Sequence, residues 1–147
     1  RDQIVRLNLQ DRQIAADSGD DLAILQVESD NLIPLPIAER HQAAEVGAPI
    51  CVISHPANHF YCYSSGVVSR RSDVRTPDGL SQRFSITADY ARGSSGAPVL
   101  NERGQVVGIV KSTESIYYSQ SNGQPRNLQM VFKHCIPAEN LLKLISS

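Results

Sequence analysis

The sequence predicts an all-β protein that ends in one α-helix. Short apolar segments recur along its 147 residues, and turn-forming residues separate them, which is typical of a β-barrel or sandwich. The clearest helical spacing comes last, where Pro137 suits a first helical turn and Leu141, Leu142 and Ile145 share one face. The length suits a single domain with its own core.

The expected strands follow from alternation and from short apolar runs. Residues 3–9 alternate apolar and polar side chains, so this strand should bury one face. Residues 22–27 form a more continuously apolar strand, and residues 31–46, which contain two prolines, form a connection with room for a short helical turn. The segment 115–126 is expected to be a solvated hairpin loop. Six further strands are expected at residues 49–53, 60–70, 80–87, 98–100, 105–111 and 128–133.

The charge balance excludes some partners. A net charge of −1 argues against nucleic acid or an anionic membrane surface, because both require clustered Lys and Arg. The densest basic stretch, Arg70-Arg71 with Arg75 nearby, is offset by Asp73 and Asp78 and is expected to be a solvated loop. No apolar run approaches the length of a membrane span.

The three cysteines leave one alternative open. Cys51 and Cys62 flank a candidate hairpin connection, so a cross-strand disulfide is conceivable, although two ordinary half-buried thiols are the favoured interpretation. Cys135 is expected to lie in a strand. No zinc site is expected, because the separation of His55 and His59 spans a proline and no helix.

The segment from Gly93 to Leu100, Gly-Ser-Ser-Gly-Ala-Pro-Val-Leu, carries the chemistry. A serine between glycines can serve as a nucleophile, because the glycines allow a sharp turn that brings backbone N–H groups close to a substrate carbonyl. The alternative is an ordinary Gly/Ser turn between two strands. A second segment favours the first interpretation, since Asp20-Asp21 stands at the start of an apolar strand well upstream.

Together these segments resemble the chymotrypsin-like serine peptidases, in particular the bacterial trypsin-like branch that includes the HtrA proteases. The likeness extends through Gly66-Val67-Val68-Ser69 and ends at Ile136-Pro137, so it covers nearly the whole chain. It implies a double β-barrel whose C-terminal barrel is complete and whose N-terminal barrel is partial. The implied boundaries are 1–30 for the last strands of the first barrel, 31–46 for the crossover, 47–135 for the second barrel and 136–147 for the C-terminal helix.

The resemblance also implies roles for individual residues. Ser95 is the expected nucleophile and Asp21 the triad acid, with Asp20 as its alternative, and the N–H groups of Gly93 and Ser95 are the expected oxyanion hole. The expected substrate-binding residues are Asp89, Tyr90, Ala91, Arg92, Val110, Lys111, Ser112 and Thr113.

Two of these residues raise particular questions. Asp89 could select basic side chains or could be structural, because a pocket acid acts only when it is buried beneath the substrate. Lys111 replaces the small polar residue usual at its position, which leaves open its contact with the triad acid.

The family's catalytic histidine precedes the acid, and no histidine precedes Asp21. The resemblance therefore implies a serine endopeptidase whose histidine lies upstream of Arg1, so that these residues alone are inactive. The missing segment of the N-terminal barrel, from the same protein or another chain, is an expected partner. The alternative is a catalytically inactive relative that binds peptides or scaffolds a complex. A polypeptide substrate and an extracytoplasmic location are implied, and no cofactor is expected.

Overall fold

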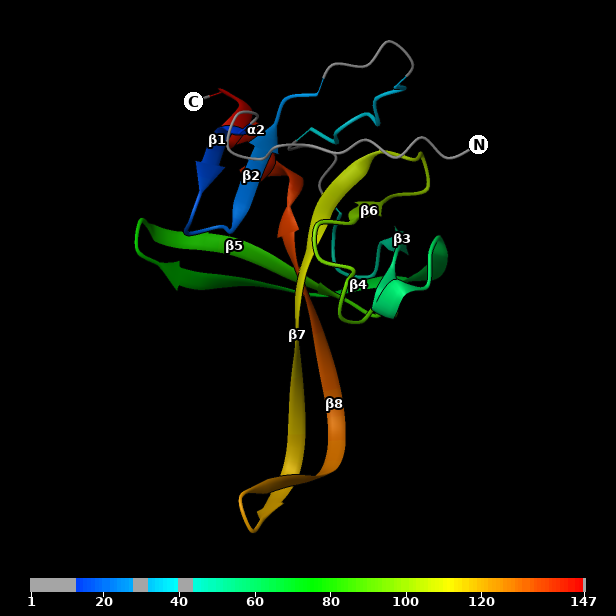
Figure 1. Cartoon of the computed structure of the whole chain (residues 1–147), viewed down its shortest axis with the longest axis vertical. Helices are drawn as coiled ribbons and strands as arrows, with labels where there is room; N and C mark the ends of the chain where they lie inside the picture. Colours follow the sequence, from blue (N-terminus) through cyan, green and yellow to red (C-terminus); the bar gives the residue numbers. More distant parts are fainter. Residues whose placement is uncertain (1–12, 28–31, 40–43, 147) are drawn as a thin grey trace.

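The computed structural model describes residues 13–27, 32–39 and 44–146 of the chain. The described residues form a two-stranded antiparallel sheet, a closed barrel, a short 3-10 helix and one α-helix (Figure 1). The small sheet pairs β1 (Gln13–Asp17) with β2 (Leu22–Leu25). The barrel has the order β3-β4-β5-β8-β7-β6. Its strands are β3 (Pro49–Ser54), β4 (Cys62–Thr76), β5 (Gly79–Ile86), β6 (Pro98–Leu100), β7 (Val106–Ser121) and β8 (Gln124–Pro137).

The barrel core arises from alternation along the strands. In β3, Ile50, Val52 and Ser54 are buried while the residues between them are more exposed, as a period of two requires. Val52, Val68 and Val99 are fully buried. The core cluster consists of Ala38, Ile50, Val52, Val68, Phe84, Ile86, Ala88, Tyr90, Val99, Val107, Val110 and Cys135.

Glycine at position 108 allows this core to close. A Cβ there would collide with the Phe84 ring and the backbone oxygen of Ile136, so any side chain would push β7 away from β5 and β8.

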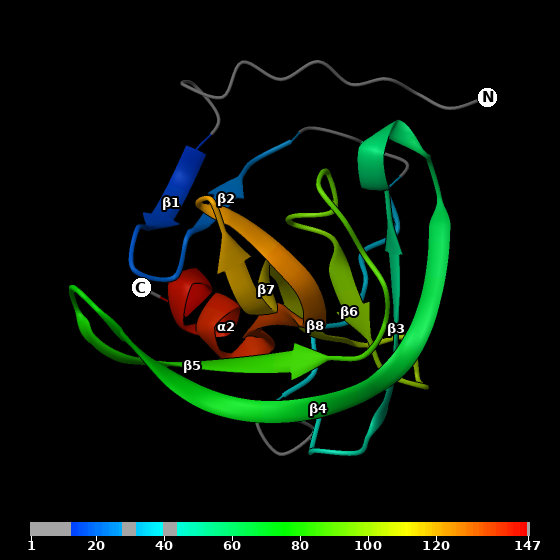
Figure 2. The same cartoon turned by 90° about the horizontal axis from the view of Figure 1, so that it is seen from below.

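The helix α2 (Ala138–Ser146) follows β8 directly and lies beside β1 and the barrel ends of β7 and β8 (Figure 2). Its predicted apolar face is only partly correct. Leu141 and Leu142 are half-buried, but Ile145 is 54% exposed. The polar Asn140 is buried instead, because it faces a buried carboxylate described below. No described helix is long and apolar enough to cross a membrane.

The segment 115–126 is a solvent-exposed hairpin, as expected, but it consists of paired strands where a loop was expected. β7 and β8 pair continuously from the barrel to the pair Ser121 and Gln124. The turn is formed by Asn122 and Gly123, both with positive φ, which is the preferred chemistry of a two-residue hairpin. The result is a long two-stranded arm that projects from the barrel (Figure 1).

The solvated loop expected around Arg70, Arg71 and Arg75 is also wrong, because all three lie within β4. β4 continues to Thr76, where it pairs with Gly79 of β5. Charged side chains on an exposed ribbon do not interrupt backbone pairing, and this hairpin leaves the barrel too (Figure 1).

Two expectations concern the N-terminal region. The strand expected at residues 3–9 lies outside the described residues, as do residues 40–43 of the connection. β1 was not predicted, since its Ala-rich sequence carries little strand signal. Within the connection, Ile37 forms an isolated parallel bridge with Val106.

The register of β3 and β4 answers the disulfide question. Cys51 faces Ser65, and Cys62 faces Ser54, so the two thiols are three residues apart along the hairpin. Both are free and half-buried, as the favoured interpretation held. Cys135 is a buried strand residue, which confirms that expectation.

Candidate functional site

Ser95 lies in a tight turn between β5 and β6, with its side chain exposed. Gly93 and Gly96 flank it with φ of +98° and +87°, where glycine is favoured. A Cβ at Gly93 would lie 2.8 Å from the backbone oxygen of His55, so a side chain there forces the turn to shift. The Ser95 hydroxyl donates to the backbone oxygen of Lys111 at 3.0 Å. The turn is thereby fixed against β7.

The backbone N–H groups alternate in this turn. The N–H of Ser94 donates to a carbonyl of the same turn at 3.0 Å, and that of Gly96 donates to β7 at 2.9 Å. The N–H groups of Gly93 and Ser95, each one residue earlier, have no acceptor within the described part of the chain. Two donors without an acceptor, one on the serine itself and one two residues before it, are the groups that an oxyanion hole requires.

The peptide bond before Gly93 has a fixed orientation. The Arg92 carbonyl accepts the N–H of Ala57 at 2.7 Å, from the short 3-10 helix η2 (Pro56–Asn58) between β3 and β4. Because the C=O and N–H of a trans peptide point in opposite directions, this bond directs the Gly93 N–H away from η2.

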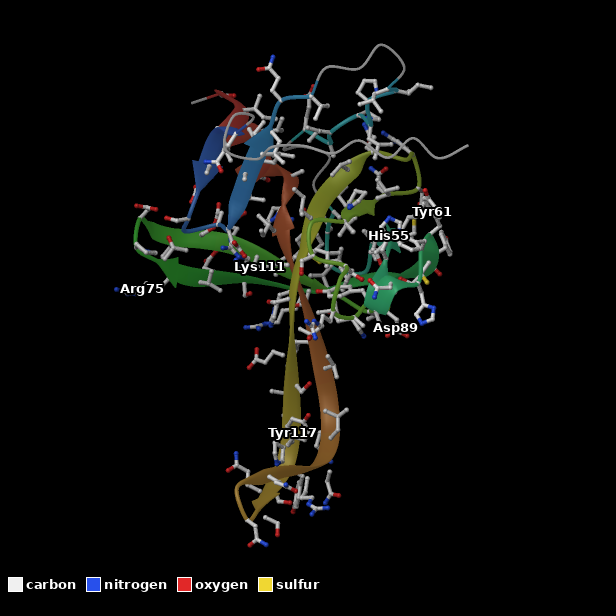
Figure 3. The ribbon with its side chains drawn as sticks, in the orientation of Figure 1. His55, Tyr61, Arg75, Asp89, Lys111 and Tyr117 are labelled. Carbon is white, nitrogen blue, oxygen red and sulfur yellow. The ribbon has the colours of Figure 1, made fainter. Side chains whose placement is uncertain are left out.

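Asp21 and Ser95 both contact Lys111, Asp21 through the lysine side chain and Ser95 through the lysine backbone. The Lys111 ammonium is 3.3 Å from a carboxylate oxygen of Asp21, and its backbone oxygen accepts the Ser95 hydroxyl. Asp21 has a φ of +61° at the start of β2 and is exposed. Lys111 therefore does contact the expected triad acid, and the contact is an ion pair. Figure 3 shows Lys111 where β7 leaves the barrel.

Asp20 belongs to a different, buried network. Its carboxylate accepts hydrogen bonds from the Arg83 guanidinium at 2.8 Å, from the Asn140 amide at 2.6 Å and from the Ser81 hydroxyl. Burial acts to raise the pKa of Asp20, but these hydrogen bonds and the charge of Arg83 outweigh it and lower the pKa. This arrangement supports Asp21 over Asp20 as the triad acid, because Asp20 is already fully engaged.

Sequence reasoning missed this network. It joins the β1–β2 turn to β5 and α2, and Asp20 is 61 to 120 residues from its partners along the chain. No local spacing signals contacts between such distant segments.

Asp89 is not a buried pocket acid. Its side chain is 90% exposed and forms an ion pair with Lys133 at 2.8 Å, while its backbone oxygen accepts the Ser64 hydroxyl at 2.6 Å. Ala91 and Arg92 are exposed beside it. These contacts are those expected of the structural alternative.

Tyr90, by contrast, is buried. Its hydroxyl lies 2.8 Å from the backbone oxygen of Ser112 and 2.9 Å from that of His134. Burial raises the pKa of its phenol and raises that of the Cys135 thiol to about 12. Tyr90 therefore stays neutral and joins the barrel to the base of the arm.

The four predicted residues on β7 differ in availability. Val110 is buried, and its backbone N–H and C=O bond Ala97 and Gly96. Lys111 is half-buried, and Ser112 and Thr113 are exposed. The edge of β7 open to an added strand thus begins after Val110.

None of the described histidines bonds Ser95. His55 accepts the N–H of Tyr61 on Nδ1 at 2.9 Å and contacts that ring (Figure 3). His134 lies 3.2 Å from the Ser85 hydroxyl and 3.1 Å from Glu114. This row resembles a triad in composition, but Ser85 is 1% exposed and cannot reach a substrate.

Comparisons with known sequences support the same interpretation. The trypsin-like peptidase domain family matches residues 6–109. The chain is 33% identical over 105 residues to the serine endoprotease DegS of Haemophilus influenzae, covering 70% of this chain and 30% of the relative. It is 30% identical over 118 residues to a probable periplasmic serine endoprotease, DegP-like, of Hahella chejuensis, covering 80% and 24%. The chain thus spans less than a third of the length of these relatives.

Solved structures share the fold. The HtrA-type protease AlgW, solved with a decapeptide, matches with a TM-score of 0.66 at 20% identity, over 92% of this chain and 39% of that chain. A serine endoprotease from Yersinia pestis matches with a TM-score of 0.64 at 20% identity, over 91% and 42%. These matches confirm the predicted fold class.

Proposed function

The chain belongs to the trypsin-like peptidase family, and from this premise we propose that it is part of a serine endopeptidase. Ser95 is the nucleophile and Asp21 the acid of the triad. The observation that carries the proposal is the Ser95 turn, which combines an exposed hydroxyl with the backbone N–H groups of Gly93 and Ser95, neither of which has an acceptor among the described residues. The general base in this proposal is a histidine that precedes Arg1 in the parent protein.

The proposed reaction passes through an acyl-enzyme. The histidine removes the hydroxyl proton of Ser95 as its oxygen attacks the carbonyl carbon of the substrate. The N–H groups of Gly93 and Ser95 hold the oxyanion. The C–N bond then breaks as the histidine returns the proton to the leaving amine, and water hydrolyses the resulting ester with the same base.

The substrate of this proposal is a polypeptide with no requirement for a basic residue at the cleaved bond. Asp89 is exposed and neutralised by Lys133, so it lacks the buried, unpaired charge that selects Arg or Lys. The Hahella chejuensis relative, described as a probable periplasmic serine endoprotease, supports an extracytoplasmic location for the parent protein.

One observation favours a second candidate, a peptide-binding relative without hydrolytic activity. The Lys111 ammonium pairs with the Asp21 carboxylate, and it therefore competes with the positive charge that a catalytic histidine develops.

Labelling with a fluorophosphonate distinguishes the two candidates. The parent protein should gain the mass of the probe on the peptide that contains Ser95, and its Ser95→Ala variant should not. A folded parent protein that fails to label at Ser95 supports the peptide-binding candidate instead.

A further inference from the structure

The β7 strand has one open edge along the arm. Its pairing with β6 ends at Ile109, and the backbone bonds of Val110 to the Ser95 turn complete that side. From Ser112 to Ser121, β7 pairs only with β8 among the described strands. Every second residue of such an edge presents an N–H and a C=O without a strand partner.

This edge continues from the proposed nucleophile. Lys111, the residue just before it, accepts the Ser95 hydroxyl through its backbone oxygen. The stretch from Ser112 to Ser121 extends roughly 30 Å at the usual rise of a strand. A chain with its scissile carbonyl at Ser95 can therefore run antiparallel to β7, with its N-terminal side along the arm.

The side chains of the arm suit an apolar partner. Between Ser115 and Leu128, Arg126 is the only charged residue. The large apolar side chains exposed on the arm are Ile116, Tyr117, Tyr118, Leu128 and Met130, with Tyr118 78% exposed. Figure 3 shows Tyr117 far along the arm from Lys111.

The edge also lacks the usual protection against strand addition. Exposed edge strands are normally blocked by proline, lysine or inward charges. Residues 112–121 contain neither proline nor lysine, and Glu114, their one charge, is paired with His134.

Hydrogen bonds hold the base of the arm in place, which reduces the conformational entropy lost when a partner binds. The Tyr90 hydroxyl contacts the backbone oxygens of Ser112 on β7 and His134 on β8, and His134 contacts both Ser85 and Glu114. An isolated two-stranded ribbon is marginally stable in water, so a third strand stabilises it.

We propose that the open edge of β7 beyond Thr113, from Glu114 to Ser121, extends the expected substrate-binding strand and binds an apolar-rich segment of the polypeptide substrate by antiparallel strand addition. The inference rests on the proposed function. It assigns to the arm the substrate residues that lie N-terminal to the scissile bond beyond the first few, and it predicts a preference for substrates with a long extended segment before that bond.

The test compares two peptides with the same cleaved bond, one with three residues before it and one with ten. The parent protein should cleave the longer with a kcat/KM at least about tenfold higher, because several main-chain hydrogen bonds are added. In a variant whose residues 117–129 are replaced by Asn-Gly, joining the paired Ile116 and Met130, this ratio should approach one. Fluorophosphonate labelling of Ser95 should persist in that variant.

A second pair of substrates tests the edge without altering the protein. Long peptides N-methylated at alternate residues beyond the third, in either phase, should differ, since only one phase removes N–H groups that face β7. Equal cleavage of both phases, or an unchanged length preference in the shortened variant, overturns the proposal.

A measurement of peptide binding tests this proposal independently of the proposed catalytic function. Should Ser95 fail to label, fluorescence anisotropy of the long peptide on the Ser95→Ala protein still tests the edge, and no difference from the shortened variant refutes it. A different result would assign the edge to a second copy of the chain. In that case the protein dimerises as its concentration rises, the shortened variant does not, and long peptides are cleaved no faster than short ones.

Discussion

Lys111 is the residue on which the proposed chemistry depends most. Its backbone oxygen fixes the Ser95 hydroxyl, and its ammonium contacts both the Asp21 carboxylate and the Asp20 carbonyl at 3.3 Å. The backbone role is independent of side-chain identity, whereas the ammonium role is not. A substitution of Lys111 can therefore remove the charge and keep the backbone hydrogen bond to Ser95.

Replacing Lys111 by serine should strengthen the coupling between Asp21 and the proposed histidine. Without the competing cation, the histidine pKa should rise by about half a unit, because a nearby carboxylate favours the charged imidazolium. The pH of half-maximal fluorophosphonate labelling should move upward by the same amount. Lys111→Arg, which keeps the charge, is the control, and an identical profile for both variants contradicts this role.

Gly93→Ala should reduce the labelling rate of Ser95 by about a hundredfold or more, the effect of losing one oxyanion donor. The position combines a φ of +98° with a Cβ site 2.8 Å from the His55 carbonyl, so the turn has to shift. Gly104→Ala is the matched control, because Gly104 also has positive φ but open space at its Cβ. Similar labelling of both variants contradicts a role for the Gly93 N–H.

At the scale of elements, the Asp20 network joins the β1–β2 hairpin to the barrel and to α2. Asp20 is adjacent to Asp21, so the buried contacts to Ser81, Arg83 and Asn140 also fix where the proposed triad acid lies. A buried carboxylate that retains its charge needs these partners.

Asp20→Asn should lower the free energy of unfolding at pH 7 by about 1–3 kcal/mol, the usual cost of disrupting a buried charged hydrogen-bond network. The lowered pKa of Asp20 means that its carboxylate stabilises the fold above about pH 4, and that this contribution is lost as the pH falls through the folded-state pKa. Urea unfolding should therefore show the two proteins converging below pH 4. Asp73→Asn is the control at an exposed acid, and a pH-independent difference for Asp20→Asn contradicts the assignment.

The elements that the sequence predicted are those with one buried face. β3, β5 and β6 lie close to their expected positions, since burial imposes alternation. The outer halves of β7 and β8 are exposed on both faces, so their polar and aromatic composition resembles that of a loop. The register of β3 and β4 could not be predicted either. It is set by the turn at Pro56–Asn58, which places Cys51 and Cys62 at different positions along the hairpin.

For the molecule as a whole, the sequence located the Ser95 turn and Asp21 through local glycine and acid patterns. The contacts of Lys111, Asp20 and Asp89 depend on how distant segments pack, so local patterns could not predict them. The overall shape follows the same division, with a packed barrel at the centre and two exposed ribbons leaving it (Figures 1 and 2).

This shape predicts uneven protection in amide hydrogen exchange. Backbone amides of β3 and the barrel half of β7 should exchange at least about a hundredfold more slowly than those beyond Ser112, because the arm is covered on neither face. Binding of the long peptide to the Ser95→Ala protein should slow exchange on β7 of the arm. β4 beyond Arg70, which leaves the barrel in the other ribbon, is the internal control and should stay unchanged. Strong protection of the arm in the unbound protein contradicts the open edge, since it requires a strand already in place.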